Sequence, residues 1–233
     1  MNFLNKLKVF RKTFLTPLKA RTSYSQCSED LIVEQFFKSQ IKNGKSGIFV
    51  DVGSHHPKRG SNTYKLYKYG WRGFLIDMED EKVFSAKLAR PGDIVIKAAV
   101  SDKKERVNIY SPSEFSTNAT ISEKISNSQD SYKKIGVIET RRLDEILIDN
   151  KCPFNFEFLN IDIEGNDLKA IQSLSLNQFK PILICIENYS AQSGINELLK
   201  SEIHKYLDKY KYSLIGITGP STFYAKKPLV KNL

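Results

Sequence analysis

The sequence lacks several features that define common classes of protein. No apolar run approaches the roughly 20 residues that a bilayer-spanning helix needs, and none near the N-terminus is as long as the core of a secretory signal. The three cysteines, Cys27, Cys152 and Cys185, are odd in number and have no metal-ligand spacing. We therefore expect a cytoplasmic protein with reduced thiols, without a transmembrane helix or a signal peptide.

The glycine-rich fingerprint GxGxxG is also missing, which disfavours NAD(P) and FAD as ligands. The chain has 233 residues, of which 40% are hydrophobic and 27% are charged, so it is long and apolar enough for one large core. Lys and Arg outnumber Asp and Glu by 36 to 26, but residues 1–22 contain six basic residues and no acidic ones. The net charge of the remaining chain is therefore only +4, and nucleic acid is not an expected partner. We expect a basic tail over 1–22 and a single domain over 23–233.

The basic tail has the pattern of an amphipathic helix. Four large apolar residues follow one another at spacings of four, three and four, namely Phe3, Leu7, Phe10 and Phe14. Pro17 would end such a helix. One interpretation is an in-plane anchor that brings residues 2–18 onto an anionic membrane. The other is a helix that packs on the body of the protein or on a second subunit, so that the chain would form a homo-oligomer.

The rest of the chain alternates between apolar strands and amphipathic helices. Expected strands lie at 48–54, 74–80, 93–102, 156–165 and 181–188, with two more in 212–227. Expected helices lie at 29–41, 61–69, 140–150, 166–174 and 195–210, and 111–135 reads as a long polar loop. This order is typical of the α/β class, with a doubly wound parallel sheet and an antiparallel edge strand.

In such a sheet, ligands bind at the carboxyl ends of the strands. The first strand ends in a turn at Gly53, where the backbone can approach a ligand closely. At the end of the second strand, Asp77 is suited to bind ribose hydroxyl groups. The end of the third strand, with Ala99, Ser101 and Asp102, is suited to an adenine ring. These residues together predict a nucleoside site.

An ordered set of motifs resembles the FkbM family of S-adenosylmethionine-dependent methyltransferases. The motifs are YSQCSED, FVDVGSHHP, SNTYKLYKYGWRGFLID, AAVSD, VIETRRLDEIL, FLNIDIEGND and TGPSTFYAKK, which span residues 24 to 227. The resemblance implies a Rossmann-like class I methyltransferase sheet with strand order 3-2-1-4-5-7-6. It also implies O-methylation, often of sugar hydroxyl groups, with S-adenosylmethionine as cofactor.

Carried onto this chain, the resemblance implies roles for individual residues. Asp51 and Gly53 would shape the cofactor turn, and Asp77 would bind the ribose. Asp162, Glu164 and Gly165 would line the reaction centre. Three polar residues of the family motifs would close over the cofactor, although local capping explains them almost as well; they are Gln26, Asp30 and Asn62. Met78 stands where the family pattern has proline.

A sugar hydroxyl is a very weak acid, so its methylation needs a base or a metal ion. Three converging carboxylates, Asp162, Glu164 and Glu187, could repel one another, raise one pKa and create a general base. Alternatively, Asp162, Glu187 and Asn188 could hold Mg²⁺ through three oxygen donors. His55 and His56 are expected to open the helix after the first strand, where at most one would act as the base.

The sequence therefore favours an O-methyltransferase that modifies a sugar hydroxyl of a surface glycan or glycolipid precursor. It would act in the cytoplasm, peripherally on the inner face of the membrane if the tail is an anchor. One alternative is an RNA methyltransferase, against which the nearly neutral body argues. The other is a non-catalytic, membrane-associated binding module that retains the fold, but such a protein is expected to have lost its strand-end carboxylates.

Overall fold

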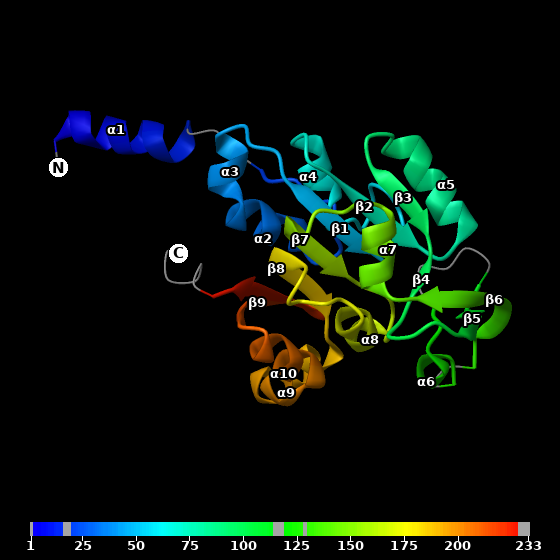
Figure 1. Ribbon diagram of the computed structural model, residues 1–233. Helices are drawn as coiled ribbons and strands as arrows, with labels where there is room; N and C mark the ends of the chain where they lie inside the picture. Colours follow the sequence, from blue (N-terminus) through cyan, green and yellow to red (C-terminus); the bar gives the residue numbers. More distant parts are fainter. Residues whose placement is uncertain (1, 16–19, 114–118, 128–129, 228–233) are drawn as a thin grey trace.

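The computed structural model describes residues 2–15, 20–113, 119–127 and 130–227. Its centre is a seven-stranded sheet in the order β3-β2-β1-β7-β8-β10-β9 (Figure 1). The strands are β1 (Ile48–Val52), β2 (Arg72–Asp77), β3 (Ile94–Lys97), β7 (Asn155–Ile161), β8 (Lys180–Glu187), β9 (Tyr212–Thr218) and β10 (Ser221–Lys226). When only the strands of this sheet are numbered, in chain order, the order is 3-2-1-4-5-7-6. Strand β10 is antiparallel to both of its neighbours. The predicted fold class and strand order are confirmed.

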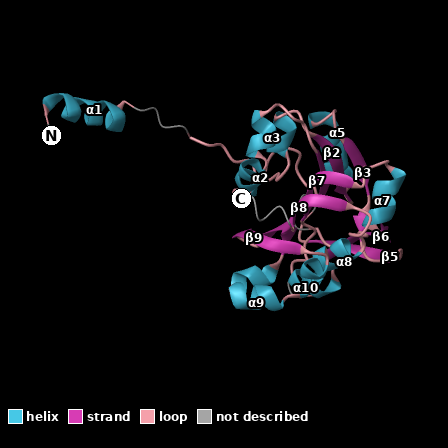
Figure 2. Cartoon of the chain, turned by 60° about the vertical axis from the view of Figure 1, so that its left-hand side comes forward, coloured by secondary structure: helices cyan, strands magenta, loops and turns pink. Residues whose placement is uncertain are grey.

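Helices cover both faces of this sheet, because its parallel strands are apolar on both sides. In β1, Phe49 packs into a core with Trp71 and Leu66, whereas the adjacent Val50 packs into a second core with Leu143. The first face carries α2 (Glu29–Phe36), α3 (Lys38–Lys42), α4 (Tyr64–Lys68) and α5 (Asp80–Ala89), and the opposite face carries α7 (Leu143–Asp149), α8 (Asp167–Gln172), α9 (Ile195–Lys200) and α10 (Glu202–Lys209) (Figures 1 and 2). A short 3₁₀ helix, η1 (Tyr189–Ser193), follows β8.

A small second sheet flanks the predicted polar loop at 111–135 and overlaps it only at its two ends. It consists of β4 (Ala99–Val100), β5 (Arg106–Ser111) and β6 (Lys133–Arg141), in the order β4-β6-β5, with α6 (Glu123–Ser126) between the last two. The predicted third strand is therefore two strands in different sheets. The helix predicted from residue 140 begins only at Leu143, since β6 continues to Arg141. The alternating apolar residues of β5 (Val107, Ile109) and β6 (Ile135, Val137) are the sequence signal for this sheet, and the prediction did not use it.

Three other predicted helices are shorter than expected or divided, and the one at 29–41 forms α2 and α3. The helix predicted at 61–69 spans Tyr64–Lys68, and the one at 195–210 is divided into α9 and α10. Ser201 causes the second division, because its side chain accepts a hydrogen bond from the backbone of His204 and thus caps α10.

The N-terminal helix α1 (Phe3–Phe14) lies apart from the rest of the structure (Figures 1 and 2). It begins at Asn2, whose side-chain oxygen accepts a hydrogen bond of 3.0 Å from the backbone of Asn5. None of its residues is buried. Within the described part of the chain, no helix combines the length and apolarity that a membrane span requires.

Candidate functional site

A cavity of about 950 Å³ opens at the carboxyl ends of β1, β2, β7 and β8. Eleven residues singled out from the sequence as site residues line it: Gln26, Asp51, Gly53, His55, His56, Asn62, Asp77, Ala99, Asp162, Glu164 and Glu187. Five others do not, namely Asp30, Ser101, Asp102, Gly165 and Asn188. The structure thus brings most of the expected strand-end residues together at one place, as the geometry of a parallel sheet requires.

Asp51, at the end of β1, holds the cavity wall together. Its two carboxylate oxygens accept hydrogen bonds from Thr63 Oγ1 (2.6 Å) and Asn160 Nδ2 (2.9 Å). The oxygen of Asn160 accepts in turn from Asn62 (2.9 Å), and Thr63 Oγ1 also accepts from the buried Arg90 (2.9 Å). Burial raises the pKa of Asp51. Its main observed contribution is therefore to fix the segment after β1 against β7.

This network allows a stability test. Thr63→Val is expected to lower the free energy of unfolding by about 1–2 kcal/mol, since it leaves Asp51 and Arg90 each short of a buried partner. Thr63→Ser keeps the hydroxyl and is the matched control, for which a smaller loss is expected. Urea unfolding of both variants measures the difference. A loss in Thr63→Ser larger than that in Thr63→Val would mean that the methyl group, and not the hydrogen-bond network, stabilises this site.

Gly53 permits the close contact between the turns after β1 and β7. Its φ is +82°, and a Cβ atom there would lie 1.8 Å from the backbone oxygen of Asp162. Its own N–H and that of Ser54 donate to the oxygen of Ile76 at the end of β2. No other residue type fits at this position, and the glycine turn thus sets where Asp162 lies in the cavity.

Asp77, at the end of β2, presents a fixed carboxylate to the cavity. Its oxygens accept hydrogen bonds from the backbone N–H groups of His55 (2.9 Å) and Glu79 (3.1 Å). Each carboxylate oxygen can accept a second bond, which leaves room for two ligand hydroxyl groups. The wall beside it is apolar and includes Ile76, Met78 and 98–100.

The two histidines do not open a helix, contrary to the sequence prediction. They lie in the irregular segment before α4, which starts only at Tyr64. His56 is exposed, and its Nδ1 accepts from the backbones of Lys58 (3.1 Å) and Arg59 (2.9 Å). His55 has a left-handed backbone (φ 43°), and its buried Nδ1 has no hydrogen-bond partner among the described residues. Burial lowers the pKa of His55, so its imidazole is neutral at physiological pH.

Asp162 and Glu187 lie side by side beneath the cavity. They directly follow Ile161 and Ile186, which are paired in the parallel register of β7 and β8. The side-chain atom Glu187 Oε2 is buried and has no hydrogen-bond partner in the described part of the chain. Burial, with Asp162 as the next cause, raises the pKa of Glu187 to about 9, and burial also raises that of Asp162. The two carboxyl groups therefore hold at least one proton near neutral pH.

The loop after β7 completes this acidic cluster. Asp167, in the first turn of α8, accepts hydrogen bonds of 3.0 Å from the backbones of Ile163 and Gly165 and so orders the loop. Glu164 (φ 51°) accepts a bond of 3.2 Å from the hydroxyl of Tyr189. Burial raises the pKa of Glu164 as well.

The residues do not fit the predicted Mg²⁺ site. The side-chain oxygen of Asn188 caps η1 by accepting from Ser190 (3.2 Å), and its nitrogen donates to Ser201 (2.9 Å). Asn188 therefore has a structural role outside the cavity wall. Across the described ranges, no group of three or more His, Cys, Asp or Glu side chains is arranged to hold a metal ion.

Other residues of the predicted adenine and cofactor regions also have structural partners. Ser101 is buried, and its side chain donates to Asp102 (3.1 Å) at the end of β4. Asp30 is buried and accepts hydrogen bonds from Ser23 (2.6 Å) and from the backbone of Tyr24 (2.8 Å). Asp30 therefore shapes the segment from which Tyr24 and Gln26 reach the cavity.

Several cavity residues escaped the sequence analysis, among them Tyr24, Lys82, Asn160, Tyr189 and Ile121. Asn160 stands two residues before Asp162 in the same strand motif, so its alternate position could have identified it. The aromatic Tyr189 lies two residues after the end of β8. Lys82 and Ile121 come from α5 and the β5–β6 connection, and no local pattern in the sequence relates them to the strand ends.

Comparison with known proteins gives one extensive match. Residues 51–214 match the family described as the methyltransferase FkbM domain. Among solved structures, a protein from Pyrococcus horikoshii described as an RNA methyltransferase has a TM-score of 0.46 at 9% identity, with 95% of this chain and 98% of that chain covered. The O-methyltransferase from Bacillus cereus, in complex with SAH, has a TM-score of 0.44 at 12% identity, with 96% of this chain and 90% of that chain covered. No curated protein matches the chain.

Proposed function

Because the chain belongs to the FkbM methyltransferase domain family, we propose that it transfers the methyl group of S-adenosylmethionine to a sugar hydroxyl of a surface glycan or glycolipid precursor. The observation that carries this proposal is the cavity at the strand ends, where the anchored carboxylate of Asp77 and the proton-holding pair of Asp162 and Glu187 face one space. Nucleoside recognition and proton acceptance are the two tasks that O-methylation requires of the protein.

The residues of the β2 side fit a nucleoside. Asp77 is positioned by two backbone N–H groups and retains acceptor capacity for ribose hydroxyls. Ile76, Met78 and Val100 offer an apolar wall for a base. The volume of about 950 Å³ is at the upper end of the range for ligand sites, so a second molecule has room beside the cofactor.

The residues of the β7 and β8 side are suited to proton transfer. When bound, S-adenosylmethionine supplies an activated methyl group, whose bond to sulfur breaks as the bond to the acceptor oxygen forms. Asp162 accepts the proton of the acceptor hydroxyl, and the neighbouring Glu187, whose pKa is raised, can share that proton with it. The raised pKa of this pair brings its basicity closer to that of the group it must deprotonate. Glu164 and Tyr189 border the same space and can orient the acceptor.

The charge of the cavity supports a neutral acceptor over RNA. Asp162, Glu164 and Glu187 line it together, and no salt bridge neutralises any of them among the described residues. In all, six acidic residues line the cavity against two basic ones, Arg59 and Lys82, so it stays negative with Glu187 protonated and repels a phosphate backbone. A sugar instead offers hydroxyl groups from which carboxylates can accept hydrogen bonds. Cys27, Cys152 and Cys185 are all free, which agrees with a reaction in the reducing cytoplasm.

The cofactor part of this proposal is tested by binding. Asp77→Asn is expected to weaken S-adenosylmethionine binding roughly tenfold to hundredfold, the scale of about 1–3 kcal/mol for a lost hydrogen bond to a charged group. Isothermal titration calorimetry measures it. Asp80→Asn is the matched control, because that side chain is exposed and pairs with Lys97 outside the cavity. A wild-type protein that binds NADH and not S-adenosylmethionine would overturn the proposed function.

A further inference from the structure

Helix α1 exposes a continuous apolar stripe that no part of the described structure covers. The exposed fractions of its large apolar side chains are 77% for Phe3, 46% for Leu7, 53% for Phe10 and 69% for Phe14. At 100° per residue these four positions lie within about 60° of one another around the helix. The rings of Phe10 and Phe14 are in contact, with centroids 4.9 Å apart. This geometry disfavours the alternative that α1 packs on the body of its own chain.

A helix of 12 residues is only marginally stable in water without tertiary contacts. Helix α1 has no buried residue, so a partner that covers the apolar stripe must supply most of its stability. The helix is capped by Asn2 and has basic residues in its last turn, both of which favour its formation once such a partner is present.

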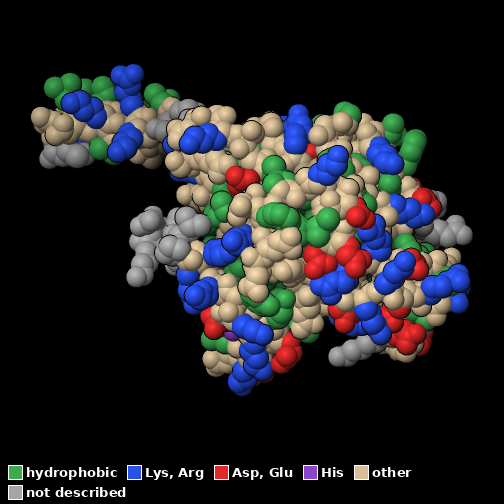
Figure 3. Space-filling view, viewed as in Figure 1, with side chains coloured by type: hydrophobic (Ala, Val, Ile, Leu, Met, Phe, Trp, Pro, Cys, Tyr) green, Lys and Arg blue, Asp and Glu red, His purple; other side chains and the backbone are tan. Residues whose placement is uncertain are grey.

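The charges on α1 indicate the chemistry of this partner. Lys6 and Arg11 flank the stripe on its two sides, and Lys8 and Lys12 lie on the opposite face, whereas the helix has no acidic residue. Figure 3 shows basic and apolar side chains on the surface of α1 without acidic ones. A surface with negative charge above an apolar layer complements both faces at once.

We propose that α1 binds in the plane of anionic lipid membranes, with the stripe of Phe3, Leu7, Phe10 and Phe14 in the acyl boundary and the basic residues at the lipid headgroups. The body then remains in solution, close to the bilayer. Helix α3 lies where the N-terminal segment joins the body (Figure 1), and its exposed Lys38 and Lys42 add positive charge there.

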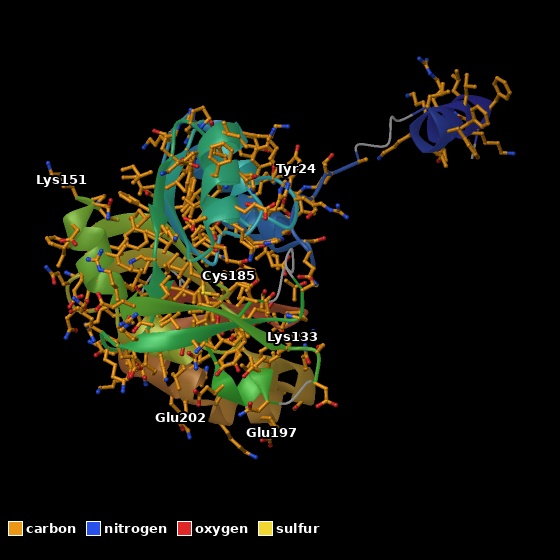
Figure 4. The ribbon with its side chains drawn as sticks, turned by 90° about the vertical axis from the view of Figure 1, so that its right-hand side faces the viewer. Tyr24, Lys133, Lys151, Cys185, Glu197 and Glu202 are labelled. Atoms are coloured by element: carbon orange, nitrogen blue, oxygen red, sulfur yellow. The ribbon has the colours of Figure 1, made fainter. Side chains whose placement is uncertain are left out.

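The connection between α1 and the body makes this binding relevant to the cavity. From Leu15 to Tyr24 the chain can extend over at most about 30 Å. Tyr24 lies on the side of the body that faces α1 (Figure 4), and it lines the cavity together with Ser25 and Gln26. The cavity is thus held within reach of the membrane surface. If the proposed function is correct, this placement favours an acceptor saccharide that is attached to a lipid.

The test is sedimentation of the full-length protein with vesicles. Binding is expected to vesicles of about 30% phosphatidylserine and about 70% phosphatidylcholine at low salt, with at least roughly tenfold weaker binding to pure phosphatidylcholine. Leu7→Gln with Phe10→Gln removes the centre of the stripe, and the triple variant Lys6→Glu, Lys8→Glu and Arg11→Glu reverses the charge. Each set is expected to lower vesicle binding at least roughly tenfold. Val9→Gln with Thr13→Gln lies off the stripe and is the matched control, for which little change is expected.

Three results would overturn the proposal: no binding of the wild type at low salt, equal loss in stripe and control variants, or a dimer in solution that only the stripe variants dissociate. The last would identify a second copy of the chain as the partner. S-adenosylmethionine affinity, measured on the same samples, is expected to be unchanged. This measurement separates the two proposals. A protein that does not bind S-adenosylmethionine would contradict the proposed function, whereas its vesicle binding would still support the membrane proposal.

Discussion

Replacing Asp162 with Asn is expected to lower kcat by about 10²–10⁴, the usual contribution of a positioned general base. The variant keeps the size of the side chain and removes its ability to take a proton. S-adenosylmethionine affinity is expected to change far less, because Asp162 follows β7, whereas the ribose is assigned to Asp77 at the end of β2. The measurement is transfer of labelled methyl groups to glycans isolated from cells that lack this protein.

Asp102→Asn is the control for this experiment. Asp102 also follows a strand end, but it does not line the cavity, and full activity is expected. EDTA is expected to leave the wild-type rate unchanged, since the amide of Asn188 is occupied by Ser190 and Ser201. If Asp162→Asn had the full rate, Asp162 would not be the base, and His55 would be the next candidate. If EDTA abolished activity and Mg²⁺ restored it, a metal ion would act in place of the base.

The sheet could be predicted because its information is local. Each buried strand is a short apolar run with a polar residue at its carboxyl end, and parallel strands bring those ends to one edge. Asp51, Asp77, Asp162 and Glu187 were placed in one cavity by this argument alone. The strand order itself came from the resemblance to the FkbM family.

The sequence does not reveal the hydrogen-bond partners of these polar side chains. Asn188 looked like a free oxygen donor, yet its side-chain oxygen accepts from the backbone of Ser190, and its nitrogen donates to Ser201 at the start of α10. Asp51 looked like a ligand-binding residue, and its carboxylate is engaged by Thr63 and Asn160. Asp102 follows a β-strand, but that strand, β4, belongs to the second sheet, and Asp102 does not line the cavity. Side-chain roles depend on such contacts, which no spacing rule contains.

The second prediction with a large effect is that Glu187→Gln stabilises the ligand-free protein above neutral pH. In the folded state the pKa of Glu187 is raised from 4.5 to about 9, first by burial and then by Asp162. Between these two pH values the folded state binds more protons than the unfolded state, so the stability of the wild type falls as pH rises. A glutamine side chain is neutral and avoids this loss.

The variant is therefore expected to exceed the wild type by about 3 kcal/mol in unfolding free energy at about pH 8.5, and by little at about pH 5. Urea unfolding at the two pH values measures this, with Glu197→Gln as the control, because that side chain is exposed on α9 beside Lys200 (Figure 4). The Glu187→Gln variant is also expected to turn over more slowly, since the amide that replaces the carboxyl group cannot share a proton with Asp162. Gain of stability with loss of turnover is the signature of a buried charge retained for chemistry. A Glu187→Gln protein less stable than the wild type at the higher pH would show that the carboxylate is instead satisfied in the folded state.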